Sequence, residues 1–193
     1  MTFDDGPGSR LTPLVLNVLA QNNVKATFFL LGRNIQGRED IVKQITVQGH
    51  EICSHGYDHL NYWKVSPIRA IKDIKRGWQA IDAVLDNNNK RGKYPFRPPY
   101  GKLNIISLIY LLVHKVPICY WTIVTGDTWM EDKRDINHSA SVLKTKNGGA
   151  TLAHDFDRSS NNTDEFVIES LVKIIATVEE NNIKIITFAE LND

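Results

Sequence analysis

Apolar positions follow two different spacings along this chain. Between Leu11 and Gln21 the apolar side chains recur every three to four residues, which predicts an amphipathic helix. The same spacing predicts further helices over Glu39–Val47, Pro67–Leu85, Leu103–His114, Asn137–Lys144 and Glu165–Asn181. Short apolar runs rich in β-branched and aromatic residues instead predict strands at Thr2–Phe3, Ala26–Leu31, His50–Cys53, Tyr94–Arg97, Pro117–Val124, Ala150–Ala153 and Lys184–Thr187.

The predicted strands and helices alternate along the whole chain, which is typical of parallel β-α units and therefore of an α/β fold. The run Ala26–Leu31 is almost continuously apolar, which predicts a strand buried on both faces. We find no repeat, linker or low-complexity segment, and Asn87–Asn89 is interpreted as a loop that ends a helix. The sequence thus predicts one domain over residues 1–193. A strand that starts at the first residue favours truncation at the amino terminus.

Five polar clusters each follow directly after a predicted strand. They are Asp4–Asp5, His55–His59, Arg97–Tyr100, Asp127 and His154. Parallel α/β folds gather their active sites at the carboxyl ends of the strands. Chance explains one such cluster more easily than five, so we expect these residues to share one site.

Composition and charge exclude some classes of function. The 193 residues include 23 basic and 22 acidic side chains, for a formal net charge of +1. A nucleic-acid partner would require a clustered excess of lysine and arginine, so none is expected. The longest apolar run, Ile105–Val113, is too short to cross a bilayer, so no transmembrane segment is expected. Cys53 and Cys119 lie in strand-like runs and are compatible with buried thiols or with a disulfide.

The candidate metal ligands are histidines and aspartates. His55 and His59 are four residues apart, so both imidazoles can reach one ion from a single helical turn. A zinc protease of the His-Glu-x-x-His type needs glutamate where this chain has Gly56, which excludes that class. Asp4 and Asp5 point in different directions, so one can bind an ion while the other accepts a proton. Taken singly, the histidines are equally compatible with a surface helix, and the aspartates with a solvated turn.

Two other motifs carry candidate chemistry. The prolines of Arg97-Pro-Pro-Tyr100 fix the backbone, so the arginine can align a carboxylate and a backbone N–H beyond them can stabilise an oxyanion. The same residues are compatible with a simple strand terminator. His154, at the end of a predicted buried strand, suits general acid or base work, although a lone histidine there is more often structural.

Together these motifs resemble the polysaccharide deacetylase family, also called the NodB-homology domain or carbohydrate esterase family 4. The chain carries Thr-Phe-Asp-Asp-Gly-Pro, His-x-x-x-His, Arg-Pro-Pro-Tyr, Thr-Gly-Asp and Leu-x-His in the family's order, between Thr2 and Leu191. The run Gly49–Ile52 is similar to the family's lead-in to the histidine motif. The resemblance implies a distorted (β/α) barrel, a polysaccharide or oligosaccharide substrate, and an extracytoplasmic or cell-wall location.

The resemblance also implies a role for each motif. It implies that Asp4 is the general base, oriented by Arg97. It implies that His154 is the acid that protonates the leaving group, and that Asp127 favours the charged form of this histidine. The implied ligands of a divalent ion, usually zinc, are Asp5, His55 and His59.

The remaining implied residues surround the substrate. The backbone amide of Tyr100 would help to hold the oxyanion, and Leu152 and Trp129 would wall the pocket for the acetyl methyl group. Aromatic side chains can stack on sugar rings in an open groove, or belong to the core. The candidates for such stacking are Tyr57, Trp63, Tyr100 and Trp129.

The chain departs from the family pattern at two motifs. Gly56 stands where the family usually has serine or threonine, whose hydroxyl supports the metal site. The fourth motif usually reads Asp-x-x-Asp-Trp, whereas here Val124 replaces the first carboxylate and Trp129 comes one position later. These differences affect the pocket wall and the support of the histidine loop.

The function that the resemblance implies is metal-dependent removal of acetyl groups from a carbohydrate polymer. We expect the substrate to be N-acetylglucosamine of chitin or peptidoglycan. An O-acetyl esterase acting on acetylated xylan would use the same residues. A catalytically inactive carbohydrate-binding relic of the fold is a third alternative, but retention of Asp4 and His154 argues against it, because a binding protein needs neither.

Overall fold

The computed structural model describes residues 1–85, 94–158 and 161–191, and its centre is a sheet in which every pairing is parallel. The order of the strands in this sheet is β3-β2-β1-β5-β4. Neighbouring parallel strands and intervening helices confirm the predicted α/β class. The strand bounds are β1 Thr2–Asp4, β2 Thr27–Leu30, β3 Glu51–Ser54, β4 Ile123–Val124 and β5 Thr151–His154.

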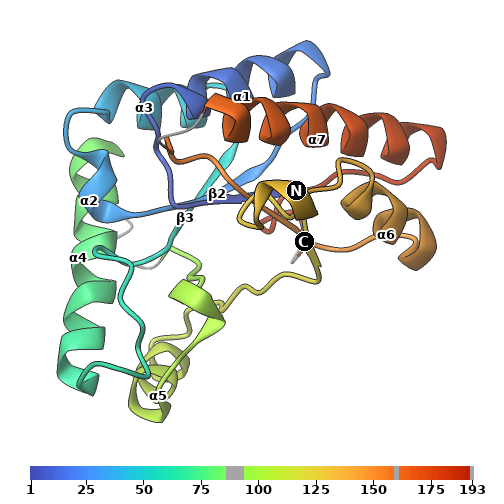
Figure 1. Ribbon diagram of the computed structural model, residues 1–193. Coiled ribbons are helices and arrows are strands. Elements are labelled where there is room, and N and C mark those ends of the chain that lie inside the picture. The colour runs from blue at the N-terminus through green and yellow to red at the C-terminus, as the bar shows by residue number, and fades with distance from the viewer. Residues whose placement is uncertain (86–93, 159–160, 192–193) are drawn as a thin grey trace.

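Helices surround the strands on several sides (Figure 1). Three of them, α1, α3 and α7, lie across one side, while α4 and α5 lie on the others (Figure 1). Most bounds agree with the apolar spacing, but the short helix α2 was not predicted. The helices are α1 Leu11–Gln21, α2 Gly32–Ile35, α3 Glu39–Val47, α4 Pro67–Leu85, α5 Ile105–Val113, α6 His138–Lys146 and α7 Asn161–Glu180. None of the helices in the described ranges has the length and apolar character that crossing a membrane requires.

Strand side chains alternate between two environments. Phe3, Phe28 and Ile52 pack into the main core together with side chains from the surrounding helices. Their neighbours in sequence point to the opposite face, where the register places Asp4 beside both Phe29 and His154. This second face is therefore the interior of a curved sheet, and it carries the polar residues of the candidate site.

The segment between Ile118 and Val124 joins the two edges of the curved sheet. On one side, Phe96 forms bridges with Ser54 of β3 and with Ile118. On the other, Ile123–Val124 pairs with β5. The single strand predicted over Pro117–Val124 is thus divided into two short pieces, and the strand predicted over Tyr94–Arg97 is reduced to the bridge at Phe96. The chain closes the sheet on itself by passing from one edge to the other.

The predicted last strand, Lys184–Thr187, is wrong: no strand is formed there within the described residues. The amides at its end donate to side chains instead of to a neighbouring strand, from Thr187 to Glu190 and from Phe188 to the hydroxyl of Thr27. The loop predicted at Asn87–Asn89 lies outside the described residues.

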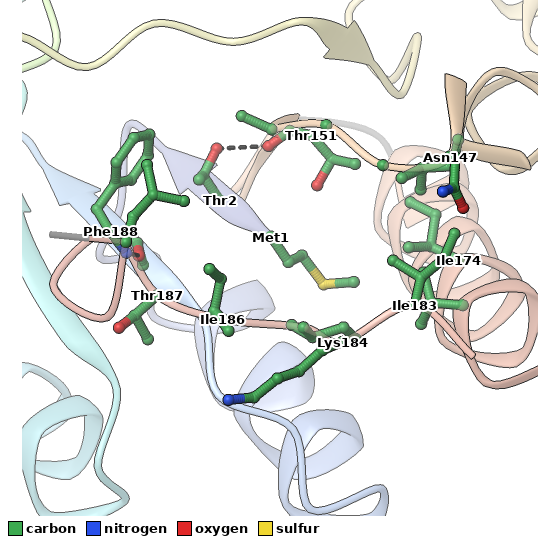
Figure 2. Close-up of a pocket in the computed structure, with 18 residues that line it drawn as sticks. Met1, Thr2, Asn147, Thr151, Ile174, Ile183, Lys184, Ile186, Thr187 and Phe188 are labelled. Carbon is green, nitrogen blue, oxygen red and sulfur yellow. Dashed lines mark hydrogen bonds between the residues drawn. The ribbon is translucent and has the colours of Figure 1, made fainter. Parts of the chain in front are cut away.

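The segment Ile183–Phe188 lines a largely apolar cavity of about 410 Å³, into which the side chain of Met1 points (Figure 2). Thr2, Thr27 and Thr151, which also line it, are the first residues of β1, β2 and β5. The cavity is therefore at the amino ends of the strands, opposite to the polar clusters, and we assign it no chemistry.

The amino end of α1 is capped by a residue from the far end of the chain. The backbone amides of Ser9, Arg10 and Leu11 all donate to the carboxylate of Asp157, at 2.7 to 3.2 Å. The hydroxyl of Ser9 donates to the same carboxylate. These contacts satisfy amides that a helix leaves without partners at its start, and they tie α1 to the segment after β5.

We expect Asp157→Ala to lower the free energy of unfolding by about 1 kcal/mol, the typical cost of losing a helix cap. Urea unfolding, followed by circular dichroism, measures this difference. Asp132→Ala, which removes an exposed carboxylate from the turn Glu131–Lys133, is the control and should leave the midpoint unchanged. Equal midpoints for Asp157→Ala and the parent would contradict the capping role.

Candidate functional site

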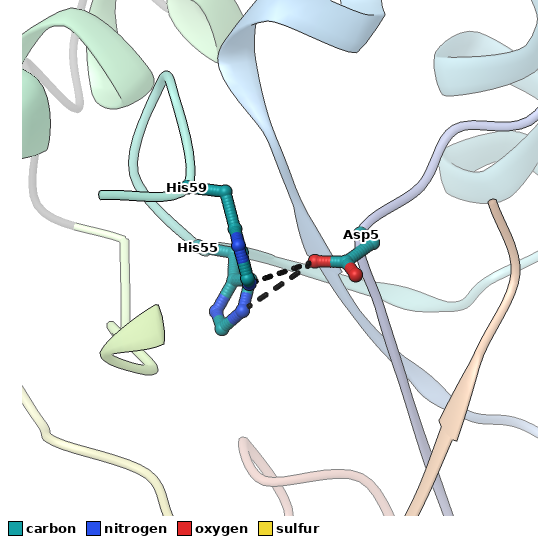
Figure 3. Close-up of side chains that lie close together, drawn as sticks. All are labelled: Asp5, His55 and His59. Carbon is teal, nitrogen blue, oxygen red and sulfur yellow. Dashed lines mark ion pairs between the residues drawn. The ribbon is translucent and has the colours of Figure 1, made fainter. Parts of the chain in front are cut away.

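Asp5, His55 and His59 come together from the ends of β1 and β3 (Figure 3). Asp5 Oδ1 lies 3.6 Å from Nε2 of His55 and 3.4 Å from Nε2 of His59. This oxygen is buried and accepts no hydrogen bond from any described residue. Two imidazole nitrogens and an otherwise unpartnered carboxylate oxygen, converging at these separations, fit a single ion with about 2.0–2.2 Å bonds to each ligand.

The ring of His55 is oriented by the backbone. Its Nδ1–H donates to the carbonyl oxygen of Arg97 at 2.7 Å, which leaves Nε2 with a free lone pair facing Asp5. Burial lowers the pKa of His55 to about 3, and burial also lowers the pKa of His59. Both rings are therefore neutral at physiological pH, which is the form that binds a metal.

The backbone turns sharply at three site residues. Asp5, His59 and Tyr100 have φ values of 71°, 57° and 58°, in the left-handed region that residues other than glycine rarely adopt. At Asp5 this turn sends adjacent carboxylates in different directions, as the sequence predicts for Asp4 and Asp5. Asn34 of α2 supports the turn, because its side-chain amide donates to the carbonyl of Asp5 at 2.7 Å.

Asp4 is held by Arg97 in the interior of the barrel. Arg97 Nη1 donates to Asp4 Oδ1 at 2.6 Å, and both side chains are almost completely buried. Asp5, His55 and His59 form a group of three candidate metal ligands. Asp4 Oδ2 lies 3.7 Å from Nε2 of His55, so the Asp4 carboxylate lies beside this group without being part of it. Burial raises the pKa of Asp4, although the charge of Arg97 acts in the opposite direction.

His154 is paired with Asp127. Its Nδ1 lies 3.0 Å from Asp127 Oδ2, and Asp127 also accepts from the hydroxyl of Thr125 and lies near Arg158. Burial alone would lower the pKa of His154. The hydrogen bond and charge of Asp127, together with the charges of Asp4 and Asp5, outweigh burial and raise this pKa to about 9. His154 is therefore a protonated donor at neutral pH.

The predicted substrate residues occupy three different settings. The backbone amide of Tyr100 has no acceptor among the residues that the structure describes, and its ring lies 4.5 Å from that of His59. Leu152 is two residues before His154 on β5, so it lies beneath this histidine on the inner face. Trp129 packs over Gly126 and beside His138. The structure brings Tyr100 to the metal-ligand candidates, and it places Trp129 on the turn that carries Asp127.

The other two aromatic candidates lie at the surface. The ring of Tyr57 is covered by the guanidinium of Arg76, at 3.7 Å from its centroid. Trp63 is 67% exposed, and its indole N–H donates to the carbonyl of Leu103. Each ring thus faces a cation, since the Nζ atom of Lys102 lies 4.9 Å from the centroid of the Trp63 ring, but Trp63 is the more exposed of the two.

Sequence reasoning assigned no role to two buried carboxylates near the site. Asp155 lies against Gly6, where a Cβ atom would come within 2.4 Å of its carboxylate. Burial raises the pKa of Asp155 to about 7. Asp73 of α4 accepts hydrogen bonds from the histidine loop. Asp73 falls on the same helix face as the buried residues Ala70 and Ile74. A carboxylate on an otherwise apolar helix face was the signal in the sequence that could have identified it. Cys53 and Cys119 are free, buried thiols.

Comparison with known proteins identifies the family. A model of the polysaccharide deacetylase family matches residues 1–111, more than half of the chain. A peptidoglycan-N-acetylglucosamine deacetylase of Listeria monocytogenes is 33% identical over 164 residues, which are 83% of this chain but 33% of that protein. The chain thus spans about a third of the length of this relative. A peptidoglycan-N-acetylglucosamine deacetylase of Bacillus cereus is 31% identical, covering 99% of this chain and 86% of that protein.

Solved structures agree with the fold. A peptidoglycan N-acetylglucosamine deacetylase in complex with a benzamide ligand has a TM-score of 0.83 and 29% identity, over 98% of this chain and 85% of that one.

Two further matches, one a sequence relative and one a solved structure, have names that do not mention N-acetylglucosamine. A bifunctional xylanase/deacetylase of Pseudobutyrivibrio xylanivorans is 30% identical, over 99% of this chain and 30% of that protein. A pseudoenzyme of Bacillus anthracis has a TM-score of 0.80 at 24% identity, over 100% of this chain and 64% of that one, and shows the fold alone.

These matches confirm the family resemblance and, with it, the distorted (β/α) barrel predicted from the sequence. The order of the motifs, the parallel strands that carry them and the convergence of Asp5, His55 and His59 all agree with this assignment. The chain belongs to the polysaccharide deacetylase family.

Proposed function

We propose that this protein is a metal-dependent hydrolase that removes N-acetyl groups from N-acetylglucosamine units of a cell-wall polymer. The observation that carries the proposal is the placement of a carboxylate and a charged imidazole beside the three ligand candidates. Asp4 is held outside that group by Arg97, and His154 is kept protonated by Asp127. A protein that only binds carbohydrate has no use for either arrangement.

In this proposal Asp5, His55 and His59 hold one divalent ion, and His and carboxylate ligands favour zinc. The ion, when bound, supplies Lewis-acid polarisation of the acetyl carbonyl and lowers the pKa of water. Residues of this chain bind the carbonyl oxygen and transfer the protons. Tyr100 offers its free backbone amide to the carbonyl oxygen as negative charge develops there.

Asp4 and His154 divide the proton transfers. Asp4 takes a proton from the water that attacks the acetyl carbon, and its raised pKa makes it a stronger base than an exposed aspartate. His154 gives a proton to the sugar nitrogen as the carbon–nitrogen bond breaks. Acetate and a free amine leave, and Asp127 stabilises the charged imidazole between turnovers.

Peptidoglycan and chitin-type polymers are the proposed substrates, because two relatives of which this chain covers 86% and 85% are named as N-acetylglucosamine deacetylases. Action on such polymers implies an extracytoplasmic location. Two alternatives have specific support. The xylanase/deacetylase relative favours O-acetyl esterase activity on acetylated xylan. The departures from the family pattern at Gly56 and Val124 keep an inactive binding protein as the third possibility.

The ligand assignment predicts the metal content of variants. His59→Ala should abolish stoichiometric zinc binding, because it removes one of three ligands from an open site. His114→Ala, directly after the end of α5, is the matched control and should retain the ion. Mass spectrometry of the metal content after dialysis measures both. A His59→Ala variant that still holds one ion per chain would show that the ligand set is wrong.

The His154–Asp127 pair predicts the alkaline limb of the pH profile. Since the pKa of His154 is raised to about 9 and activity needs its protonated form, kcat/KM should fall as pH rises through this region. Asp127→Asn removes the charge that raises the pKa, so the limb should move to lower pH. Acetate release across the pH range tests this, and an unmoved limb argues against the pairing.

Asp4→Asn separates a catalyst from a binding relic. Loss of the general base should lower acetate release from chitooligosaccharides or peptidoglycan by about 10²–10⁴-fold. The metal content should be retained, because Asp4 is outside the group of three. The variant should also unfold at a lower temperature, since it leaves the buried charge of Arg97 without its counter-ion.

The assays therefore belong well below the unfolding midpoint of the Asp4→Asn variant. Equal rates for parent and variant would exclude Asp4 as the base. A parent that hydrolyses only acetylated xylan would establish the esterase alternative. A parent that holds its ion but releases no acetate from any of the polymers would establish the binding relic.

A further inference from the structure

The histidine loop between β3 and α4 is held from two sides. Its carbonyl groups face α2, where Gly56 O accepts from the amide of Gly32 at 2.9 Å and Tyr57 O accepts from the amide of Arg33 at 3.2 Å. Two of its amides face α4, where each donates a hydrogen bond to one carboxylate oxygen of Asp73. The loop that carries His55 and His59 is therefore clamped between the start of one helix and a side chain of another.

Asp73 makes three contacts in this clamp. Asp73 Oδ2 accepts from the amide of Tyr57 at 3.1 Å, and Asp73 Oδ1 accepts from the amide of Asp58 at 2.8 Å. The hydroxyl of Tyr62 donates to Oδ2 at 2.8 Å. Asp73 is 2% exposed, so water cannot replace these donors cheaply. A carboxylate that receives two successive amides fixes the path of the backbone between the two histidines.

The glycine after His55 is matched to this carboxylate. Gly56 has a φ of 82°, and a Cβ atom at this position would lie 2.5 Å from Asp73 Oδ2 and 2.8 Å from the hydroxyl of Tyr62. A serine or threonine here would displace the carboxylate. Gly77, one turn further along α4, lets the helix approach closely, because its own Cβ would lie 2.6 Å from Gly56 O. The space that a side chain at position 56 would fill is used by Asp73.

From these contacts we infer that Asp73 is a positioning residue for the metal site. It takes the place of a hydroxyl after the first histidine, and it sets the separation of His55 and His59 through the loop backbone. The inference rests on the proposed metal-dependent function only in requiring that the two histidines bind an ion. Partners that orient metal ligands typically contribute 10–100-fold to metal affinity.

The test is the affinity for Zn²⁺, measured by competition with a chelator of known affinity at a temperature where circular dichroism shows each variant fully folded. Asp73→Asn keeps the size of the side chain but presents an amide N–H to one of the two loop amides. Its zinc dissociation constant should rise by about 10–100-fold. Asp40→Asn, an exposed carboxylate of α3, is the control for lost charge and should change the constant less than about twofold.

A second variant keeps the inference testable if Asp73→Asn does not fold. Gly56→Ala keeps the carboxylate but pushes it off the loop, so it should weaken zinc binding in the same direction. A residue that served only stability would lower the unfolding midpoint and leave the zinc constant unchanged, and that result for both variants overturns the inference. No acetylated substrate is needed, so a parent that binds zinc without hydrolysing any polymer leaves this test intact. A parent that binds no zinc overturns both the ligand set and the role of Asp73.

Discussion

The ion pair between Arg97 and Asp4 is the constraint around which the barrel interior is arranged. A buried guanidinium is unstable unless its donors are used, and here they reach Asp4, the hydroxyl of Thr2, and the carbonyls of Cys119 and Tyr120. Cys119 and Tyr120 lie in the crossing segment that joins the two edges of the sheet. The charge that orients the proposed base therefore also helps to close the barrel, since it ties β1 to the carbonyls of the crossing segment between the bridge at Ile118 and β4. The ring of Phe29 covers one face of the guanidinium, with its centroid 3.9 Å from the guanidinium carbon.

Two histidines of this site have opposite charge states although both are buried. Burial lowers the pKa of both, and the outcome depends on the partner of Nδ1. His55 donates to a neutral backbone carbonyl and remains uncharged, whereas His154 meets the carboxylate of Asp127 and remains charged. One imidazole is thus prepared to bind a cation and the other to donate a proton.

The sequence was sufficient for much of the fold and of the site, because both depend on local signals. Apolar spacing identified most helices, and Asp5 and His55 stand directly after strands whose ends meet at one edge. The helical turn expected to bring His59 beside His55 is wrong, because residues 55–59 form a non-helical loop. What could not be predicted depends on long-range pairing. The bridge at Phe96 and the missing strand at Lys184–Thr187 were decided by which neighbours offered backbone partners. Asp73 looked like one polar position in a long helix, since its partners lie in another element.

The left-handed backbone at Asp5, His59 and Tyr100 sets the chemistry of the site against the stability of the fold. Elsewhere in the chain such positions mostly fall to glycine or asparagine, which adopt this conformation most readily. At the site they carry a carboxylate, an imidazole and a phenol ring, each at a conformational cost of roughly 1–2 kcal/mol. Selection for thermostability alone would therefore favour glycine at these three positions, which would remove two candidate metal ligands, Asp5 and His59, and the ring of Tyr100. Stabilising substitutions in this protein therefore belong at the helix ends and on the surface. Substitutions that remove the strain at these three turns would also remove groups proposed for the reaction.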